Sequence, residues 1–219
     1  MLLGAVLTQS ESADAGITSD KTVEDISAYT YLDYGSFRVE HGLEAYYSDP
    51  ATRQLVVSFL EEWIGDPQVA DALIAAAEKN NLDPALVVAV AWKESGFCRE
   101  AYGVNTNDTV DRGLMQLNSR TFRNLNEEDF YNPSLNADLG ASYLKSLLDK
   151  AGNTATALAM YNAGPGRVSA IGAPKSTLEY IDSILNYKTE ISRIFYENKL
   201  SGGILVSKSV KPVKNPDLL

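Results

Sequence analysis

One ten-residue stretch constrains the fold of this chain more than any other. Residues 85–94 read ALVVAVAWKE, so the first eight positions are apolar on every side of a helix. Asp83 and Pro84 precede the stretch as an N-cap and a first-turn proline, and Gly96 follows it as a stop. A helix that is apolar all round has to be enclosed by other elements. We therefore expect residues 85–94 to form the buried centre of a helical domain.

The rest of the chain contains further helical segments and nothing that resembles a long strand. A helix is expected from Asp49-Pro50 to Gly65, because Leu55, Phe59 and Trp63 recur at helical spacing. No apolar–polar alternation of any length is visible. The predicted fold class is therefore mostly α. The remaining predicted helices span residues 67–80, 133–150, 153–160 and 177–198.

The composition narrows the range of functions. A formal net charge of −10 argues against a nucleic-acid-binding protein, which needs a basic surface to meet phosphates. The one cysteine, Cys98, excludes an intramolecular disulfide, and the one histidine, His41, leaves a zinc site with almost nothing but carboxylates as ligands. We therefore expect no metal and no cofactor. Composition allows a nucleophile pair of Cys98 and His41, although neither residue lies in a recognisable peptidase motif.

Charge also divides the chain. Residues 1–65 hold 11 acidic and 3 basic side chains, whereas the remainder is nearly balanced. The short apolar start, followed by Ala13-Asp14-Ala15, fits either a truncated export signal or a disordered segment. No run approaches the roughly 20 apolar residues of a membrane span. The predicted regions are residues 1–22, disordered or the remnant of an export signal; 23–65, an acidic helical extension; 66–200, the main domain; and 201–219, a flexible tail.

Glu94 is the acidic side chain whose position most suggests chemistry. It ends the apolar helix, so its carboxyl group should be poorly solvated. Poor solvation raises the pKa of a carboxylic acid and keeps it protonated near neutral pH, which is the state that a general acid needs. The alternative is that Glu94 only marks the point where the helix reaches water. Position alone does not decide between these interpretations.

Three further segments follow Glu94-Ser95 along the chain. They are GLMQLN at residues 113–118, YNAGPG at residues 161–166, and the pair Tyr180-Ile181. In this order and spacing, the four pieces resemble the sequence motifs of the soluble lytic transglycosylase family. The catalytic domain of that family is similar to goose-type lysozyme. The resemblance covers roughly residues 67–198, so it implies that the main domain, residues 66–200, is a catalytic domain.

The resemblance also implies roles for individual residues. Glu94 matches the catalytic glutamate of the family, and Tyr180 matches a tyrosine whose hydroxyl group lies near it. Both would sit in a sugar-binding cleft. The residues that the resemblance places in contact with substrate are Ser95, Met115, Gln116, Tyr161, Asn162 and Tyr180.

The implied activity is cleavage of the β-1,4 bond between N-acetylmuramic acid and N-acetylglucosamine, leaving 1,6-anhydromuramyl ends. Most glycosidases use two carboxylates. The motifs here supply one, which suffices if the substrate provides its own nucleophile. A hydrolytic lysozyme remains an alternative if Asp108 or Asp111 reaches the cleft and holds a water molecule. A non-catalytic glycan-binding or assembly protein is a further alternative, which the complete set of cleft residues disfavours.

The loop before GLMQLN also allows a calcium site, built from oxygens of Asn105, Asn107, Asp108 and Asp111, although the spacing does not match the usual calcium loop. A solvated surface loop is the simpler interpretation. The expected partners are peptidoglycan strands, with a cell-envelope protein as a possible partner of residues 23–65. Because peptidoglycan lies outside the cytoplasmic membrane, the implied location is the periplasm or the cell envelope. We expect residues 1–65 to be dispensable for the chemistry.

Overall fold

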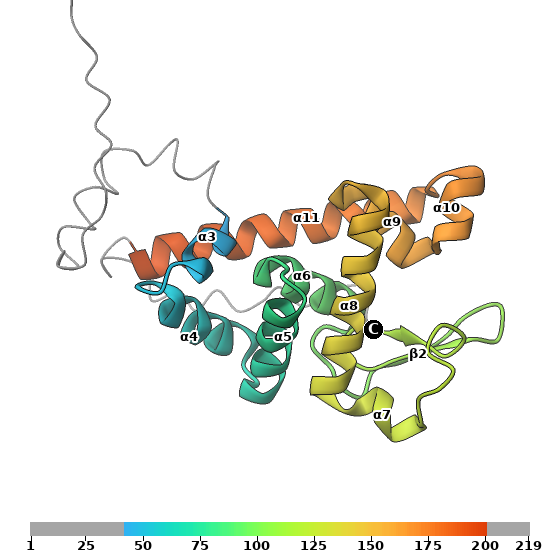
Figure 1. Cartoon of the computed structure of the whole chain (residues 1–219), viewed down its shortest axis with the longest axis horizontal. Coiled ribbons are helices and arrows are strands. Elements are labelled where there is room, and N and C mark those ends of the chain that lie inside the picture. Colours follow the sequence, from blue (N-terminus) through green and yellow to red (C-terminus); the bar gives the residue numbers. More distant parts are fainter. Residues whose placement is uncertain (1–41, 201–219) are drawn as a thin grey trace, which may run out of the picture.

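The computed structural model of the protein describes residues 42–200, and an apolar helix lies at its centre. This helix, α6, spans Pro84–Ser95, and every residue from Pro84 to Trp92 is buried. Helices α3 (Leu43–Ser48), α5 (Pro67–Lys79) and α11 (Lys175–Phe195) pack against it. Figure 1 shows α11 as a long helix that runs past α6, with α3 near one end and α10 near the other. The predicted buried centre is therefore confirmed.

The other helices complete a mostly α fold, as predicted. The longest of them, α8, packs against both α5 and α9. Their bounds are α4, Arg53–Ile64; α7, Glu127–Tyr131; α8, Pro133–Ala151; α9, Thr154–Ala163; α10, Pro165–Ile171; and the π-helical end of α11, η1, Tyr196–Leu200.

The same local device begins three of these helices. A side-chain oxygen accepts a hydrogen bond from a backbone N–H of the first turn, and a proline occupies the first helical position. The cap residue is Asp66 for α5, Asp83 for α6 and Asn132 for α8. Because caps and prolines act locally, these helix starts agree with those expected from the sequence.

The inner face of α4 differs from the prediction. Asp49 and the following proline form a turn, and the helix begins only at Arg53. Phe59 and Trp63 are buried as expected, but Leu55 is 41% exposed and Val56 is buried instead. The buried positions follow the i, i+3, i+4, i+7 pattern of an amphipathic helix, whereas the sequence analysis used a strict four-residue step.

A small antiparallel sheet lies between α6 and α7, and the sequence analysis did not predict it. Its strands are β1 (Tyr102–Val104), β2 (Val110–Arg112) and β3 (Leu117–Asn118), in the order β1-β2-β3. Strands of two or three residues are too short to show an alternating pattern. In Figure 1 the sheet and α7 lie on the opposite side of the molecule from α3 and α4.

The hydrophobic core is continuous across residue 66. Leu43 and Tyr47 of α3, and Phe59 and Trp63 of α4, belong to the same buried cluster as the residues of α6. The indole N–H of Trp63 donates a hydrogen bond to the Tyr187 hydroxyl group at 2.9 Å. The described part of the N-terminal extension therefore packs against the main domain. The domain boundaries themselves remain predictions, and the regions 1–22 and 201–219 lie outside the described residues.

Between residues 42 and 200, no helix is both long and apolar enough to cross a bilayer.

Substitution of Trp63 tests the continuous core. We expect Trp63→Ala to lower the free energy of unfolding by about 3–5 kcal/mol, because it removes a large buried ring and leaves a cavity. Leu55→Ala, on the exposed side of the same helix, serves as the control and should change it by less than about 1 kcal/mol. Urea denaturation of the three proteins provides the measurement. Similar losses for the two variants would contradict the packing of α4 described above.

Candidate active site

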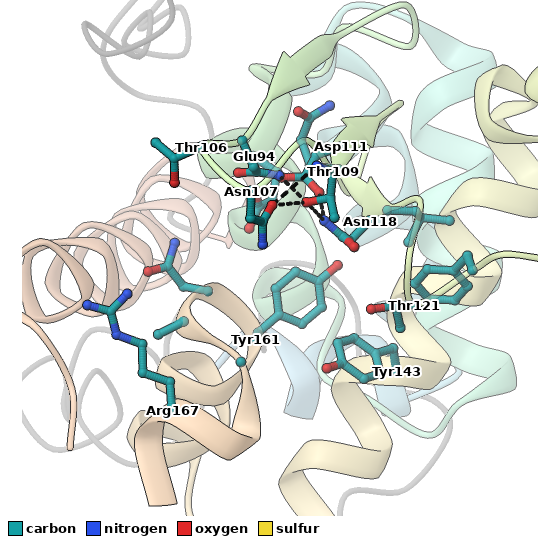
Figure 2. A pocket seen from close by; sticks show the side chains of 17 residues that line it. Glu94, Thr106, Asn107, Thr109, Asp111, Asn118, Thr121, Tyr143, Tyr161 and Arg167 are labelled. Atoms are coloured by element: carbon teal, nitrogen blue, oxygen red, sulfur yellow. Dashed lines mark hydrogen bonds between the residues drawn. The ribbon is translucent and has the colours of Figure 1, made fainter. Parts of the chain in front are cut away.

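A polar cavity of about 450 Å³ opens at the C-terminal end of α6. Glu94 reaches it from the last turn of that helix, and the sheet region, α8, α9 and α10 form its other walls. Figure 2 shows Tyr161 near the centre of the view, with Asp111 and Asn118 on the sheet side and Arg167 on the α10 side. The volume suits a small ligand or a few sugar units of a longer chain.

The Glu94 carboxyl group has the environment of a general acid. It is half-buried, and the Tyr180 hydroxyl group donates a hydrogen bond to its Oε1 at 2.5 Å. Burial raises the pKa of Glu94 from 4.5 to about 7, and the negative charge of Asp111 adds to this effect. The hydrogen bond from Tyr180 and the charge of Lys93 act in the opposite direction. The raised pKa agrees with the expectation drawn from the apolar helix.

Two tyrosines next to Glu94 stay neutral and act as hydrogen-bond donors. Burial, followed by the charge of Glu94, raises the pKa of both Tyr161 and Tyr180 well above 10. The Tyr161 hydroxyl group donates to the backbone carbonyl of Met115 at 2.9 Å. Tyr180 is buried in α11 and is not among the lining residues, so its hydroxyl group contacts Glu94 from behind the cavity wall.

Ser95 and Met115 support the site without lining the cavity. The Ser95 hydroxyl group lies 2.8 Å from the Leu114 carbonyl oxygen, to which it donates, and this bond ties the end of α6 to the GLMQLN segment. The Met115 side chain is fully buried against Gly140 of α8. Both were expected to contact substrate. Their positions favour an indirect role, in which they hold the lining residues in place.

Gln116 and Asn162 do line the cavity, as the resemblance implied. Gln116 has a φ of 46°, and its side-chain amide donates to the backbone carbonyls of Ala101 and Gly113. The Asn162 carbonyl oxygen accepts a hydrogen bond from the Thr177 hydroxyl group at 2.8 Å. Of the seven residues predicted for the site, the cavity wall therefore includes Glu94, Gln116, Tyr161 and Asn162.

A buried asparagine that the sequence analysis missed holds the GLMQLN segment. Asn136 of α8 is fully buried, and its Oδ1 accepts from the Met115 backbone N–H at 2.8 Å. Its amide group donates to the carbonyls of Phe130 and Arg112. Gly113 has a φ of 78°, and a Cβ at this position would lie 2.2 Å from the Asn136 amide nitrogen. The glycine is therefore required by both backbone conformation and space.

Asp111 reaches the cavity, and Asp108 does not line it. The amide group of Asn105 donates to one carboxylate oxygen of Asp111, and that of Asn118 donates to the other, each at 2.7 Å. These bonds use the Asp111 oxygens that the calcium alternative would need. Asp108 is exposed in a turn with a φ of 62°. Asn105 and Asn118 were not predicted as partners of Asp111, because the contacts depend on the unpredicted sheet.

The described structure offers no support for a nucleophile pair of Cys98 and His41. Cys98 is exposed and does not line the cavity, and His41 lies outside the described residues. Within residues 42–200, no group of three or more His, Cys, Asp or Glu side chains is arranged to hold a metal ion.

Comparison with known proteins places this chain in a family. Residues 71–183 match the family described as "Transglycosylase SLT domain". The X polypeptide of Escherichia coli is 31% identical over 150 residues, which are 66% of this chain and 83% of that protein. The transglycosylase of Enterobacteria phage PRD1 is 38% identical over 96 residues, which are 43% of this chain and 34% of that protein.

A solved structure also overlaps the chain. The 70 kDa soluble lytic transglycosylase Slt70 of Escherichia coli aligns with a TM-score of 0.48 and 18% identity, over 82% of this chain and 36% of that one. The family match alone covers half of the present chain. The protein therefore belongs to the transglycosylase SLT domain family, and its enzyme class is that of the peptidoglycan lytic transglycosylases.

The hydrogen bond between Tyr180 and Glu94 predicts a change in the pH profile. It favours the carboxylate form, so Tyr180→Phe should raise the pKa of Glu94 further. For a general acid, kcat/KM falls as the pH rises through the pKa of the free enzyme. In the parent enzyme we expect this fall in kcat/KM, the alkaline limb of the pH profile, near pH 7. In Tyr180→Phe the alkaline limb should move to higher pH, and the maximal rate should fall about tenfold.

Tyr187→Phe is the matched control, because Tyr187 lies on the same helix and bonds to Trp63 instead. Its alkaline limb should coincide with that of the parent enzyme. An unshifted alkaline limb in Tyr180→Phe would contradict the expectation that Tyr180 lowers the pKa of the group that limits the rate.

Proposed function

We propose that this enzyme cleaves the β-1,4 bond between N-acetylmuramic acid and N-acetylglucosamine, with Glu94 as both general acid and general base. The observation that carries the proposal is the Glu94 carboxyl group, which has a pKa raised to about 7 and faces a polar cavity. A carboxyl group with this pKa is substantially protonated near neutral pH, yet it is also a useful base once it has lost its proton. One residue can then serve both steps of the reaction.

In the first step, Glu94 donates its proton to the glycosidic oxygen. The carbonyl oxygen of the muramyl N-acetyl group attacks C1 of the same sugar, and the bond between C1 and the glycosidic oxygen breaks. The departing N-acetylglucosamine carries the proton, and a cyclic oxazolinium cation remains. Tyr180 then stabilises the Glu94 carboxylate through the hydrogen bond that it already donates.

In the second step, the Glu94 carboxylate removes the proton from the C6 hydroxyl group of the muramyl sugar. The C6 oxygen attacks C1, and the bond from C1 to the N-acetyl oxygen breaks. A 1,6-anhydromuramyl end forms, the N-acetyl group is restored, and no water is consumed. Glu94 is again protonated and ready for the next strand.

The position of Asp111 on the cavity wall makes hydrolysis a second candidate reaction. Most glycosidases use two carboxylates that face one cavity, and here Glu94 and Asp111 both line it. The second carboxylate, Asp111, can hold a water molecule or stabilise the sugar cation. Two amide donors fix the Asp111 side chain, so it is a positioned group and not a mobile surface residue. In the lyase mechanism its charge would stabilise the oxazolinium cation. We expect this electrostatic role, with anhydromuramyl ends as the main product.

We also propose a location for the enzyme and a protein partner for its N-terminal extension. Peptidoglycan lies outside the cytoplasmic membrane, so we place the enzyme in the periplasm or at the cell envelope. A cell-envelope protein remains a proposed partner of residues 23–65. The burial of Leu43, Tyr47 and Trp63 favours packing on the main domain as the role of the described part of that extension.

Substitution of Glu94 tests the catalytic assignment. Glu94→Gln keeps the shape of the side chain but cannot donate a proton, so cleavage of purified peptidoglycan should fall by about 10²–10⁴-fold. Glu100→Gln, an exposed glutamate outside the cavity wall, is the control and should retain the parent rate. Turbidity loss and release of muropeptides provide the rates. Glu94 is not the acid if its folded variant keeps more than a few per cent of the activity.

Products of the Asp111→Asn variant distinguish the two outcomes. If Asp111 acts electrostatically, the variant should be about tenfold slower and should still form anhydromuramyl ends. Asp108→Asn, in the same loop but outside the cavity wall, should behave like the parent enzyme. Mass spectrometry separates the two products, since they differ by one water molecule. Reducing muramyl ends that dominate in the parent and disappear in Asp111→Asn would instead support hydrolysis.

A further inference from the structure

The cavity wall carries more acidic than basic side chains, although the substrate is itself anionic. Three charged side chains line the cavity, and two of them, Glu94 and Asp111, carry carboxyl groups. The third, Arg167, is the only cation among the lining residues that the structure describes. The whole chain has a formal net charge of −10. Among the described residues of the cavity wall, Arg167 alone can therefore attract a strand that carries carboxylates.

Arg167 is placed to bind a group from outside the protein. It is exposed on α10, and in Figure 2 its guanidinium group lies on the α10 side of the cavity, away from Asp111. Within residues 42–200, Arg167 forms no hydrogen bond or ion pair. By contrast, Arg53, Arg99 and Arg193 all pair with carboxylates of the protein.

We propose that Arg167 binds a carboxylate on the lactyl side chain of the muramyl unit, and so determines which glycan strands the enzyme accepts and how they lie in the cleft. This inference rests on the proposed function. A guanidinium group offers two parallel N–H donors that match a carboxylate, which a lysine or an amide cannot reproduce. Strands made only of N-acetylglucosamine carry no such group, so the contact distinguishes peptidoglycan from other β-1,4 glycans.

The charge distribution also fixes the orientation of the strand. The carboxylate-bearing side of the muramyl unit is repelled by Asp111 and attracted to Arg167, which lies on the α10 wall. The sugar ring then lies between the two walls, next to Glu94. Arg167 is thus a specificity-determining residue, and it takes no part in the proton transfers.

The carboxylate has two possible sources. In peptide-free strands it is the lactyl carboxylate itself, and in peptide-bearing strands the lactyl carbonyl is an amide and the nearest carboxylates belong to the stem peptide. The test therefore uses both kinds of strand, together with the same strands after their carboxylates have been converted to amides. The parent enzyme is compared with Arg167→Gln and Arg167→Lys, and with Arg123→Gln, an exposed arginine outside the cavity wall.

We expect Arg167→Gln to lower kcat/KM about tenfold on carboxylate-bearing strands, mainly by raising KM, because the contact forms already in the bound substrate. Arg167→Lys should recover part of this loss. On amidated strands Arg167→Gln should match the parent enzyme, and Arg123→Gln should match it on every substrate. A loss confined to peptide-free strands assigns the contact to the lactyl carboxylate, and a loss confined to peptide-bearing strands assigns it to the stem peptide.

An unchanged kcat/KM of Arg167→Gln on carboxylate-bearing strands would overturn the inference while leaving the proposed function intact, and so would either of two further results. One is an equal loss for Arg167→Gln on amidated and carboxylate-bearing strands, and the other is an equal loss for Arg123→Gln. If the parent enzyme cuts neither kind of unmodified strand, the proposed function itself fails, and the inference fails with it.

Discussion

Enclosure of α6 is the constraint on which the rest of the structure depends. A helix that is apolar on every side cannot lie on a surface, so α3, α5 and α11 have to pack around it. The last turn of α6 is fixed by a stack between Trp92 and Tyr187, whose ring centres are 4.0 Å apart. Two residues after Trp92, at Glu94, the buried core gives way to the cavity. Glu94 is therefore held at the boundary between core and solvent, where burial raises the pKa of its carboxyl group.

The cleft separates the residues that face a substrate from those that hold them. Glu94, Gln116 and Tyr161 line the cavity. Behind them, Tyr180 fixes the carboxyl group and Asn136 fixes the backbone of the GLMQLN segment. The supporting residues are buried and nearly fully hydrogen-bonded, which restricts the motion of the lining side chains. A sequence motif of this kind therefore mixes positions that contact substrate with positions that only maintain the geometry.

Features that depend on local sequence were predictable, whereas features that depend on contacts between distant segments were not. The long helices were predictable because their caps, prolines and apolar faces are local features. The strands near the cleft were not, because two or three residues carry no periodicity, and the contacts of Asp111 with Asn105 and Asn118 depend on them. Glu94 was identified from its place on the apolar helix and from the motif. Asn136 was missed, since a single polar residue inside a helix does not reveal the carbonyls that it will meet.

The raised pKa of Glu94 links the proposed acid function to the stability of the fold. Its carboxyl group titrates near pH 4.5 in an unfolded chain and near 7 in the folded protein, so folding between these pH values takes up a proton. Stability associated with this group is complete below about pH 4.5 and falls as the pH rises towards 7, by about 3 kcal/mol in total. The protonated form, which donates to the glycosidic oxygen in the proposed mechanism, is thus also the form in which the fold is more stable. If Glu94 is the acid that we propose, alkalinisation of the surroundings lowers the enzyme's activity and its stability together, through one side chain.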